Sequence, residues 1–161
     1  MKLLIVRHGD PDYSIDSLTE KGWKEVEYLS ERISKLDVDY FYVSPLGRAK
    51  DTAAPTLKKM NRTAVELEWL KEFPSRITRP DHPEEPMICW DWLPQDWTAD
   101  ARFFDYDQWY HTEAMLGGNV KEEYLRVTAA FDELLAKHGY VHDGKLFRVE
   151  RTNNDTIVFF C

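Results

Sequence analysis

The first 70 residues alternate between short apolar runs and stretches with helical periodicity, and this alternation constrains the fold most. Lys2–Val6 is a short apolar run that predicts a buried strand, and Val38–Pro45 and Thr63–Leu70 predict two more strands. From Trp23 to Leu36, apolar residues recur at steps of three and four, which predicts an amphipathic helix facing a core. Strands and helices that alternate in this order are typical of an α/β domain with a mostly parallel sheet.

Further signals mark where the predicted elements begin and end. Ser17 is the expected N-cap of the first helix, because Glu20 follows three positions later as in a capping box. Pro45 suits the first turn of a second helix, and Pro55 is expected to limit or kink that helix. The spacing predicts one more long helix over residues 119–139.

The last part of the sequence predicts a hairpin and a final strand. Asp143-Gly144 is a typical hairpin turn. Thr156–Cys161, "TIVFFC", is an unbroken apolar run, as expected for a strand that is buried on both faces of a parallel sheet. The final strand therefore belongs to the core rather than to an edge.

Residues 77–118 interrupt this pattern with prolines, many acidic residues and four of the six tryptophans. We expect an insertion with short helices here, whose tryptophans form either a small satellite core or a lid over a binding site. The predicted fold is one domain over residues 1–161. It is an α/β three-layer sandwich with a mostly parallel central sheet, helices on both faces and an aromatic-rich insertion.

Composition excludes several classes of function. The net charge of −8 argues against a general nucleic-acid binder, because such proteins need a positive face for the phosphate backbone. No apolar run approaches eighteen residues, so no membrane span is predicted, and the N-terminus lacks the pattern of a signal peptide. Cys89 and Cys161 have no metal or redox spacing and fit free thiols in a reducing cytoplasm.

Charged residues follow each of the first three predicted strands. Arg7 and His8 end the first strand, Arg48 lies in the helix after the second, and Glu72 follows the third. Parallel strands place such residues at one edge of the sheet, where ligands bind. Two arginines can hold a phosphoryl group there, and a histidine can attack it if a backbone carbonyl holds its other ring nitrogen. Gly9 leaves room for a phosphate near the backbone.

These motifs resemble those of the histidine phosphatase superfamily, the phosphoglycerate-mutase-like proteins. The matching segments are "LLIVRHG", "SLTEKG", "SPLGRAKDTA" and "LKE". The resemblance implies that His8 becomes a phosphohistidine, that Arg7 and Arg48 bind the phosphoryl group and that Glu72 is the proton donor. It implies no metal and no cofactor.

The sequence also departs from the family pattern. The family's second catalytic histidine stands directly after a late strand, which "TIVFFC" matches best, and the sequence stops at Cys161. Four other histidines follow no comparable strand: His82, His111, His138 and His142. Two accounts are open, a piece of a longer protein or a degenerate member. We expect the first, because a buried apolar strand is a poor terminus, and such a piece would bind phosphate weakly and turn over little.

The resulting hypothesis is a cytoplasmic, metal-independent phosphatase for a small phosphomonoester, with no nucleic-acid or membrane partner and no predicted oligomeric state. A phosphoglycerate mutase is disfavoured, because the residues that usually follow RHG in mutases are absent from Asp10–Tyr13. A catalytically inactive phosphate-binding domain is a further alternative. Other interpretations of the same residues are a purely structural end of the first strand, a surface position for Glu72, and a metal site formed by His8, Asp10 and Asp12. His138 and His142 are expected at the surface.

Overall fold

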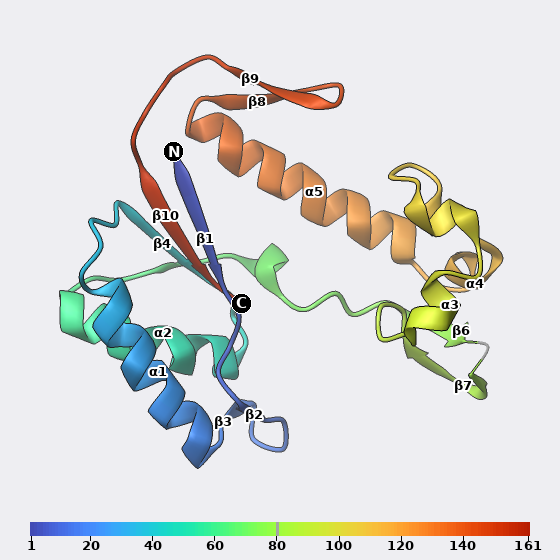
Figure 1. Cartoon of the computed structure of the whole chain (residues 1–161), viewed down its shortest axis with the longest axis horizontal. Helices are drawn as coiled ribbons and strands as arrows, with labels where there is room; N and C mark the ends of the chain where they lie inside the picture. The colour runs from blue at the N-terminus through green and yellow to red at the C-terminus, as the bar shows by residue number, and fades with distance from the viewer. Residues whose placement is uncertain (80) are drawn as a thin grey trace. The chain divides into compact units, whose positions relative to one another are not determined.

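The computed structural model describes residues 1–79 and 81–161 (Figure 1). The chain divides into two compact units, which are described separately below. The first unit comprises Met1–Glu72 and Asp132–Cys161, and the second comprises Phe73–Phe131. No helix among the described residues is both long and apolar enough to cross a membrane.

The first unit contains a four-stranded sheet in the order β1-β10-β4-β5. Its strands are β1 (Lys2–Val6), β4 (Tyr40–Val43), β5 (Val65–Glu66) and β10 (Thr156–Phe160). All three neighbouring pairs are parallel, which confirms the predicted sheet. The predicted strand over residues 63–70 is shorter than expected, because the chain turns into a 3₁₀ helix, η1 (Glu68–Leu70), directly after β5.

Strand β10 lies between β1 and β4, at the centre of the sheet. All five of its residues are buried, as predicted from the unbroken apolar run. The strand pairs with both neighbours in parallel, so that Phe160 lies opposite Val6 on one side and Val43 on the other. The side chains of β10 therefore contribute to the core on both faces of the sheet.

Two helices, α1 (Glu20–Ile33) and α2 (Gly47–Met60), pack against one face of the sheet. The buried core on this face contains Ile33, Val38, Phe41, Val43, Ala49, Ala53, Val158 and Phe160. In the sequence these residues recur at helical steps in the helices and at alternate positions in the strands. The core is therefore the direct result of the two periodicities.

The predicted cap of α1 is wrong by two residues. Thr19 is the N-cap, and its hydroxyl accepts a hydrogen bond from the Gly22 amide at 3.1 Å. Ser17 instead lies in the short antiparallel hairpin that β2 (Pro11–Asp12) forms with β3 (Ser17–Leu18). The hairpin uses the backbone of Ser17 for pairing, so the helix begins only after it.

Helix α2 continues through Pro55 and ends at Met60, so the proline does not limit it. Asn61 closes the helix in a left-handed conformation with a φ of 51°, as is common for asparagine after a helix. Pro55 therefore costs one hydrogen bond inside the helix without ending it.

The other face of the sheet meets the C-terminal end of α5 (Val120–Lys137). His138 directly follows this helix and packs edge-on against the Tyr40 ring at a centroid distance of 4.7 Å. Its Nε2 lies 3.4 Å from the Tyr42 hydroxyl, and its Nδ1 lies 3.2 Å from Asp155 Oδ2. The prediction of a surface position for His138 is therefore wrong, because only 5% of the residue is exposed.

The predicted turn at Asp143-Gly144 is confirmed. It joins β8 (Tyr140–Asp143) to β9 (Leu146–Val149) in an antiparallel hairpin, and Gly144 adopts a φ of 65°. A positive φ is a conformation that glycine adopts without steric cost.

The second unit contains an antiparallel hairpin, which the prediction of short helices alone did not include. The hairpin strands are β6 (Arg76–Arg79) and β7 (His82–Ile88). Short helices follow: α3 (Pro94–Trp97), η2 (Ala101–Phe104), η3 (Trp109–His111) and α4 (Glu113–Leu116). The prolines of β7 concealed the strand in the sequence, since a two-stranded ribbon tolerates proline where the ladder needs no donor.

Three of the clustered tryptophans take part in the core of the second unit. Trp92, Trp97 and Trp109 pack against a buried cluster of Ile77, Cys89, Tyr110, Met115 and Val120. The satellite-core interpretation is confirmed for these three residues. The organisation as one domain with residues 77–118 as an insertion and lid stays a prediction.

Candidate active site

The carboxyl ends of the strands bring the N-terminal motif to the centre of the sheet edge. The backbone N–H of His8 donates to the Cys161 carbonyl at 2.6 Å, directly after the β1–β10 ladder. The Ser44 N–H donates to the Phe160 carbonyl, at the end of β4. His8 and the segment that leads into α2 therefore leave the sheet at the same edge, as the parallel topology predicts.

The backbone of the next residue holds the ring of His8. Its Nδ1 lies 2.8 Å from the Gly9 carbonyl oxygen. A carbonyl oxygen can only accept, so in the neutral imidazole Nδ1 carries the proton and Nε2 has the lone pair. This is the arrangement that a nucleophilic histidine requires.

Gly9 lies against α1, where a side chain has no space. A Cβ at this position would come within 3.1 Å of Val26 Cγ1 and 3.2 Å of the Gly22 carbonyl oxygen. The Gly9 N–H donates to Thr52 Oγ1 at 3.0 Å, and Thr52 in turn donates to the Arg48 carbonyl at 2.7 Å. The glycine therefore lets the His8 turn approach both helices closely.

Arg7 and Arg48 have different environments. Arg7 is exposed and lines an open cavity of about 290 Å³ together with His8, Gly9, Asp10, Pro11 and Glu25. Among the described residues, no hydrogen bond or ion pair of the Arg7 guanidinium is found. Arg48 is 7% exposed, and Nη1 and Nη2 lie 2.7 Å from Asp16 Oδ1 and Glu72 Oε2 respectively. The structure thus brings Arg48 and Glu72 into direct contact.

Tyr13 covers the buried arginine. Its ring lies 5.3 Å from Arg48 Cζ, and it meets the His8 ring edge-on at a centroid distance of 6.4 Å. The tyrosine is 63% exposed. The β2–β3 hairpin therefore places an aromatic ring beside both groups.

The acidic residues after His8 have partners of their own. Asp10 accepts a hydrogen bond from the Thr19 hydroxyl at 2.7 Å, which lowers the pKa of the Asp10 carboxyl. Asp12 accepts from both the N–H and the hydroxyl of Ser14. Among the described residues, no group of three His, Cys, Asp or Glu side chains is close enough to hold a metal ion.

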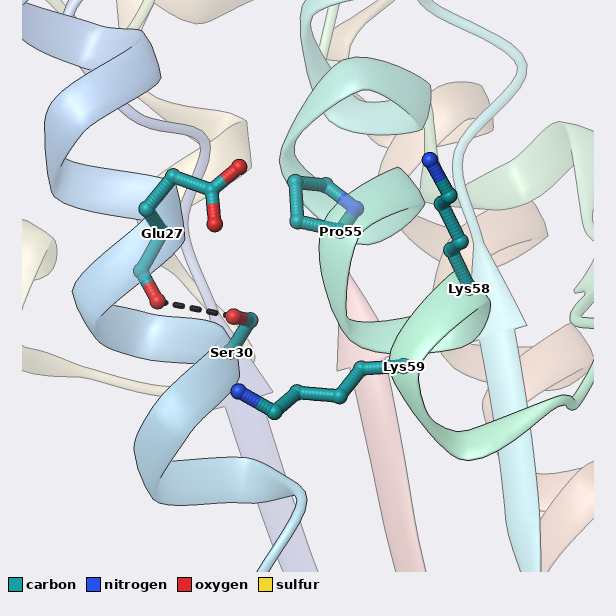
Figure 2. Close-up of a pocket in the computed structure, with 5 residues that line it drawn as sticks. All are labelled: Glu27, Ser30, Pro55, Lys58 and Lys59. Atoms are coloured by element: carbon teal, nitrogen blue, oxygen red, sulfur yellow. Dashed lines mark hydrogen bonds between the residues drawn. The ribbon is translucent and has the colours of Figure 1, made fainter.

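A second cavity, of about 380 Å³, lies between α1 and α2 (Figure 2). It is lined by Glu27, Ser30, Pro55, Lys58 and Lys59. Two of its polar side chains already have partners, because the Ser30 hydroxyl donates to the Glu27 carbonyl and Lys59 forms an ion pair with Glu31. None of the predicted site residues lines this cavity.

Comparison with protein families agrees with the geometry. The sequence model of the histidine phosphatase superfamily (branch 1) matches residues 3–142. The chain belongs to this superfamily. The match covers most of the chain, including Arg7, His8, Arg48 and Glu72.

Individual relatives of this chain include a mutase and phosphatases. A 2,3-bisphosphoglycerate-dependent phosphoglycerate mutase of Thermoplasma acidophilum is 31% identical over 80 residues, which are 44% of this chain and 40% of the relative. Phosphoserine phosphatase 1 of Hydrogenobacter thermophilus is 26% identical over 151 residues, which are 86% of this chain and 66% of the relative. The chain therefore spans less than two thirds of the length of either relative.

The fold of this chain also matches solved structures. The native structure of a mycobacterial glucosyl-3-phosphoglycerate phosphatase matches with a TM-score of 0.53 at 21% identity. The match covers 98% of this chain and 72% of that chain. The likeness shows a shared fold.

Sequence reasoning missed three residues of this candidate site: Tyr13, Asp16 and Thr52. Thr52 had a signal, because it lies one helical turn after Arg48 in the "SPLGRAKDTA" segment. Tyr13 and Asp16 had none, because their contacts with Arg48 depend on how the β2–β3 hairpin meets α2. No local pattern encodes that contact.

Proposed function

We propose that this chain carries the site of a metal-independent phosphatase that hydrolyses a small phosphomonoester through a phosphohistidine on His8. The observation that carries the proposal is the 2.8 Å contact between His8 Nδ1 and the Gly9 carbonyl oxygen, which leaves Nε2 free to attack. Arg7, Arg48 and Gly9 form the phosphoryl site, and Glu72 is the proton donor. The two free thiols fit a cytoplasmic protein.

In the first step, the lone pair of His8 Nε2 attacks phosphorus in line with the leaving oxygen. The N–P bond forms while the P–O bond to the alcohol breaks, and protonated Glu72 gives its proton to the leaving oxygen. Arg7 and Arg48 stabilise the charge on the three equatorial oxygens through charge-assisted hydrogen bonds. The contact between Arg48 and Glu72 supports this pairing of roles, because it puts the acid beside the phosphoryl site.

In the second step, water attacks the phosphohistidine. Glu72 accepts a proton from this water, the P–N bond breaks, and its electron pair returns to Nε2. The free enzyme is restored once phosphate leaves and Glu72 releases this proton to solvent. Inorganic phosphate is the product.

The names of similar proteins support a small phosphorylated substrate. They include a phosphoserine phosphatase, a glucosyl-3-phosphoglycerate phosphatase and a phosphoglycerate mutase. The match to the mutase supports phosphoryl transfer to a second hydroxyl as the alternative to hydrolysis. Release of inorganic phosphate from 3-phosphoglycerate, against formation of 2-phosphoglycerate, separates the two outcomes.

The test is to trap the intermediate. The protein is mixed with a labelled phosphomonoester and quenched, and we expect acid-labile, base-stable label on His8. His8→Ala should carry no label and retain the fold by circular dichroism. His82→Ala is the matched control, because His82 lies in the second unit beside Glu84 and should leave labelling unchanged.

Two results would contradict the proposal. Turnover of His8→Ala near the wild-type rate would show that another group attacks phosphorus. Binding of inorganic phosphate by the wild type without label or turnover would favour the inactive phosphate-binding domain instead.

A further inference from the structure

Arg48 is a buried cation shared between two carboxylates. Its Nη1 donates to Asp16 and its Nη2 donates to Glu72, each at 2.7 Å. Its Nε is buried and has no hydrogen-bond partner among the described residues. The Nε–H is therefore unused, while each terminal nitrogen already makes one hydrogen bond.

The two carboxylates differ in how firmly they are anchored. Asp16 Oδ2 accepts a hydrogen bond from the N–H of Gly47, the first residue of α2, at 2.7 Å, while Oδ1 holds Arg48. The Gly47 hydrogen bond, followed by those of Arg48, lowers the pKa of the Asp16 carboxyl below its ordinary value. Glu72 has one ion pair among the described residues, with Arg48, and its side chain is 40% exposed.

The backbone around Asp16 is shaped for this contact. Asp16 adopts a left-handed conformation with a φ of 48°. A Cβ on Gly47 would lie 2.1 Å from the Asp16 carbonyl oxygen, so the hairpin can approach α2 only because residue 47 is glycine. Ser17 adds a second link, since its hydroxyl donates to Asp51 on α2. The hairpin therefore holds Asp16 independently of Arg48.

We propose that Asp16 is a positioning residue that keeps the Arg48 guanidinium in place while Glu72 exchanges partners. The proposal rests on the proposed function. A phosphoryl group binds to Arg48 through Nε and Nη2 and displaces Glu72 from Nη2. The released Glu72 carboxylate, now next to phosphoryl charge, takes up a proton from solvent and then gives it to the leaving oxygen. Asp16 keeps its hydrogen bond from Arg48 Nη1, because the Gly47 N–H holds the second carboxylate oxygen of Asp16 in place.

The charges favour such an exchange. A phosphoryl dianion together with the carboxylates of Asp16 and Glu72 carries more negative charge than the two guanidinium groups of Arg7 and Arg48 can neutralise. The less anchored carboxylate is the one to leave, since its release costs a single partly exposed ion pair. Release of Asp16 would break its bonds to Arg48 and to the helix N-terminus together.

The kinetic test compares Asp16→Asn with Glu72→Gln in the protein that turns over. Asparagine has one oxygen in place of two, so it cannot serve both Gly47 and Arg48. We expect Asp16→Asn to lower kcat about 10- to 100-fold with p-nitrophenyl phosphate and alkyl phosphates alike, with KM changed less than about 3-fold. Glu72→Gln should mainly affect alkyl phosphates, whose leaving oxygen needs a proton. Asp143→Asn is the matched control, because Asp143 pairs with Arg148 in the β8–β9 hairpin, and it is expected to change kcat less than about 2-fold.

A double-mutant cycle shows whether Asp16 acts through Arg48. In an Arg48→Ala background, Asp16→Asn should have no further effect on kcat. An equal loss in both backgrounds would overturn the proposal, because Asp16 would then act elsewhere. A rise in KM with kcat unchanged would also overturn it.

A second measurement needs no turnover. The Nε–H signal of Arg48, followed by ¹H–¹⁵N NMR, should be rigid in the wild-type chain and stay rigid when vanadate is added. Asp16→Asn should make it mobile, whereas Glu72→Gln should not. A mobile signal in Glu72→Gln, or a rigid one in Asp16→Asn, refutes the anchoring role even if no phosphohistidine forms. If the NMR signals follow these predictions but no phosphohistidine forms, the positioning role of Asp16 is supported and the proposed function fails.

Discussion

Thr52 and Thr56 lie one turn apart on α2, and the same substitution at each should have opposite effects on stability. Both are buried, with exposures of 1% and 0%. Thr52 Oγ1 accepts from the Gly9 N–H at 3.0 Å and donates to the Arg48 carbonyl at 2.7 Å. Thr56 Oγ1 has no hydrogen-bond partner among the described residues. Valine has the shape of threonine and lacks the hydroxyl.

The magnitude follows from these contacts. Thr52→Val leaves the partly buried Gly9 N–H without an acceptor, and we expect a loss of about 1–2 kcal/mol in the free energy of unfolding. The Arg48 carbonyl loses only an additional donor, because the backbone N–H four residues later in the same helix still bonds it. Thr56→Val removes a buried polar group that has no partner, and we expect a gain of about 1 kcal/mol.

Urea unfolding checks the pair, because a shift of the midpoint at constant slope reports stability alone. The two variants should differ in melting temperature by about 2–4 °C for each kcal/mol that separates them. Amide hydrogen exchange gives a local measurement, since the Gly9 amide should exchange faster in Thr52→Val and not in Thr56→Val. Thr52→Ser, which retains the hydroxyl, should keep the protection. Equal destabilisation by both valines would refute the assignment of the hydrogen bonds.

Two other predictions concern glycine packing and pH. Gly47→Ala should destabilise the protein by about 2 kcal/mol or more and weaken phosphate binding, because the new Cβ would lie 2.1 Å from the Asp16 carbonyl oxygen. Gly117→Ala is the control, because its new Cβ would lie 3.5 Å from the nearest atom. Urea unfolding should show little change in the stability of this control. A hydrogen bond to Asp132 raises the pKa of His142 in the folded state, so its stabilising contribution is fully present below about pH 6.5 and is lost as the pH rises through the raised value. The stability difference between the wild type and Asp132→Asn should therefore be larger at about pH 5.5 than at about pH 8.5, and an equal difference at both would contradict this assignment.

The parts of the site that could be predicted are those that follow from local pattern and sheet topology. Apolar runs identified β1, β4 and β10, and a parallel sheet has its carboxyl ends at one edge. His8 follows β1 and Arg48 lies in the first turn of the helix after β4, so their place at this edge needed no knowledge of long-range packing. The Nδ1 contact of His8 is with the next residue and is equally local.

The features that could not be predicted depend on contacts between distant segments. Asp16 reaches Arg48 only because the β2–β3 hairpin folds onto the start of α2. His138 appears polar and follows a helix, yet Tyr40 and Tyr42 bury it at the sheet. Neither contact produces a periodic pattern in the sequence. Strand β7 was missed for the opposite reason, because its prolines are a local signal against a strand.

The central position of β10 has a consequence for the order of folding. Strands β1 and β4 are not neighbours in the sheet, and each pairs with β10, which comes far later along the chain. During synthesis, β1 and β4 therefore cannot form their pairs with β10 until that strand has been made. Because these pairs join residues that are far apart in the sequence, formation of the sheet is expected to be slow. The backbone of His8 is fixed by Cys161 in the same event. The backbone of His8 is thus ordered only when β10 has joined the sheet.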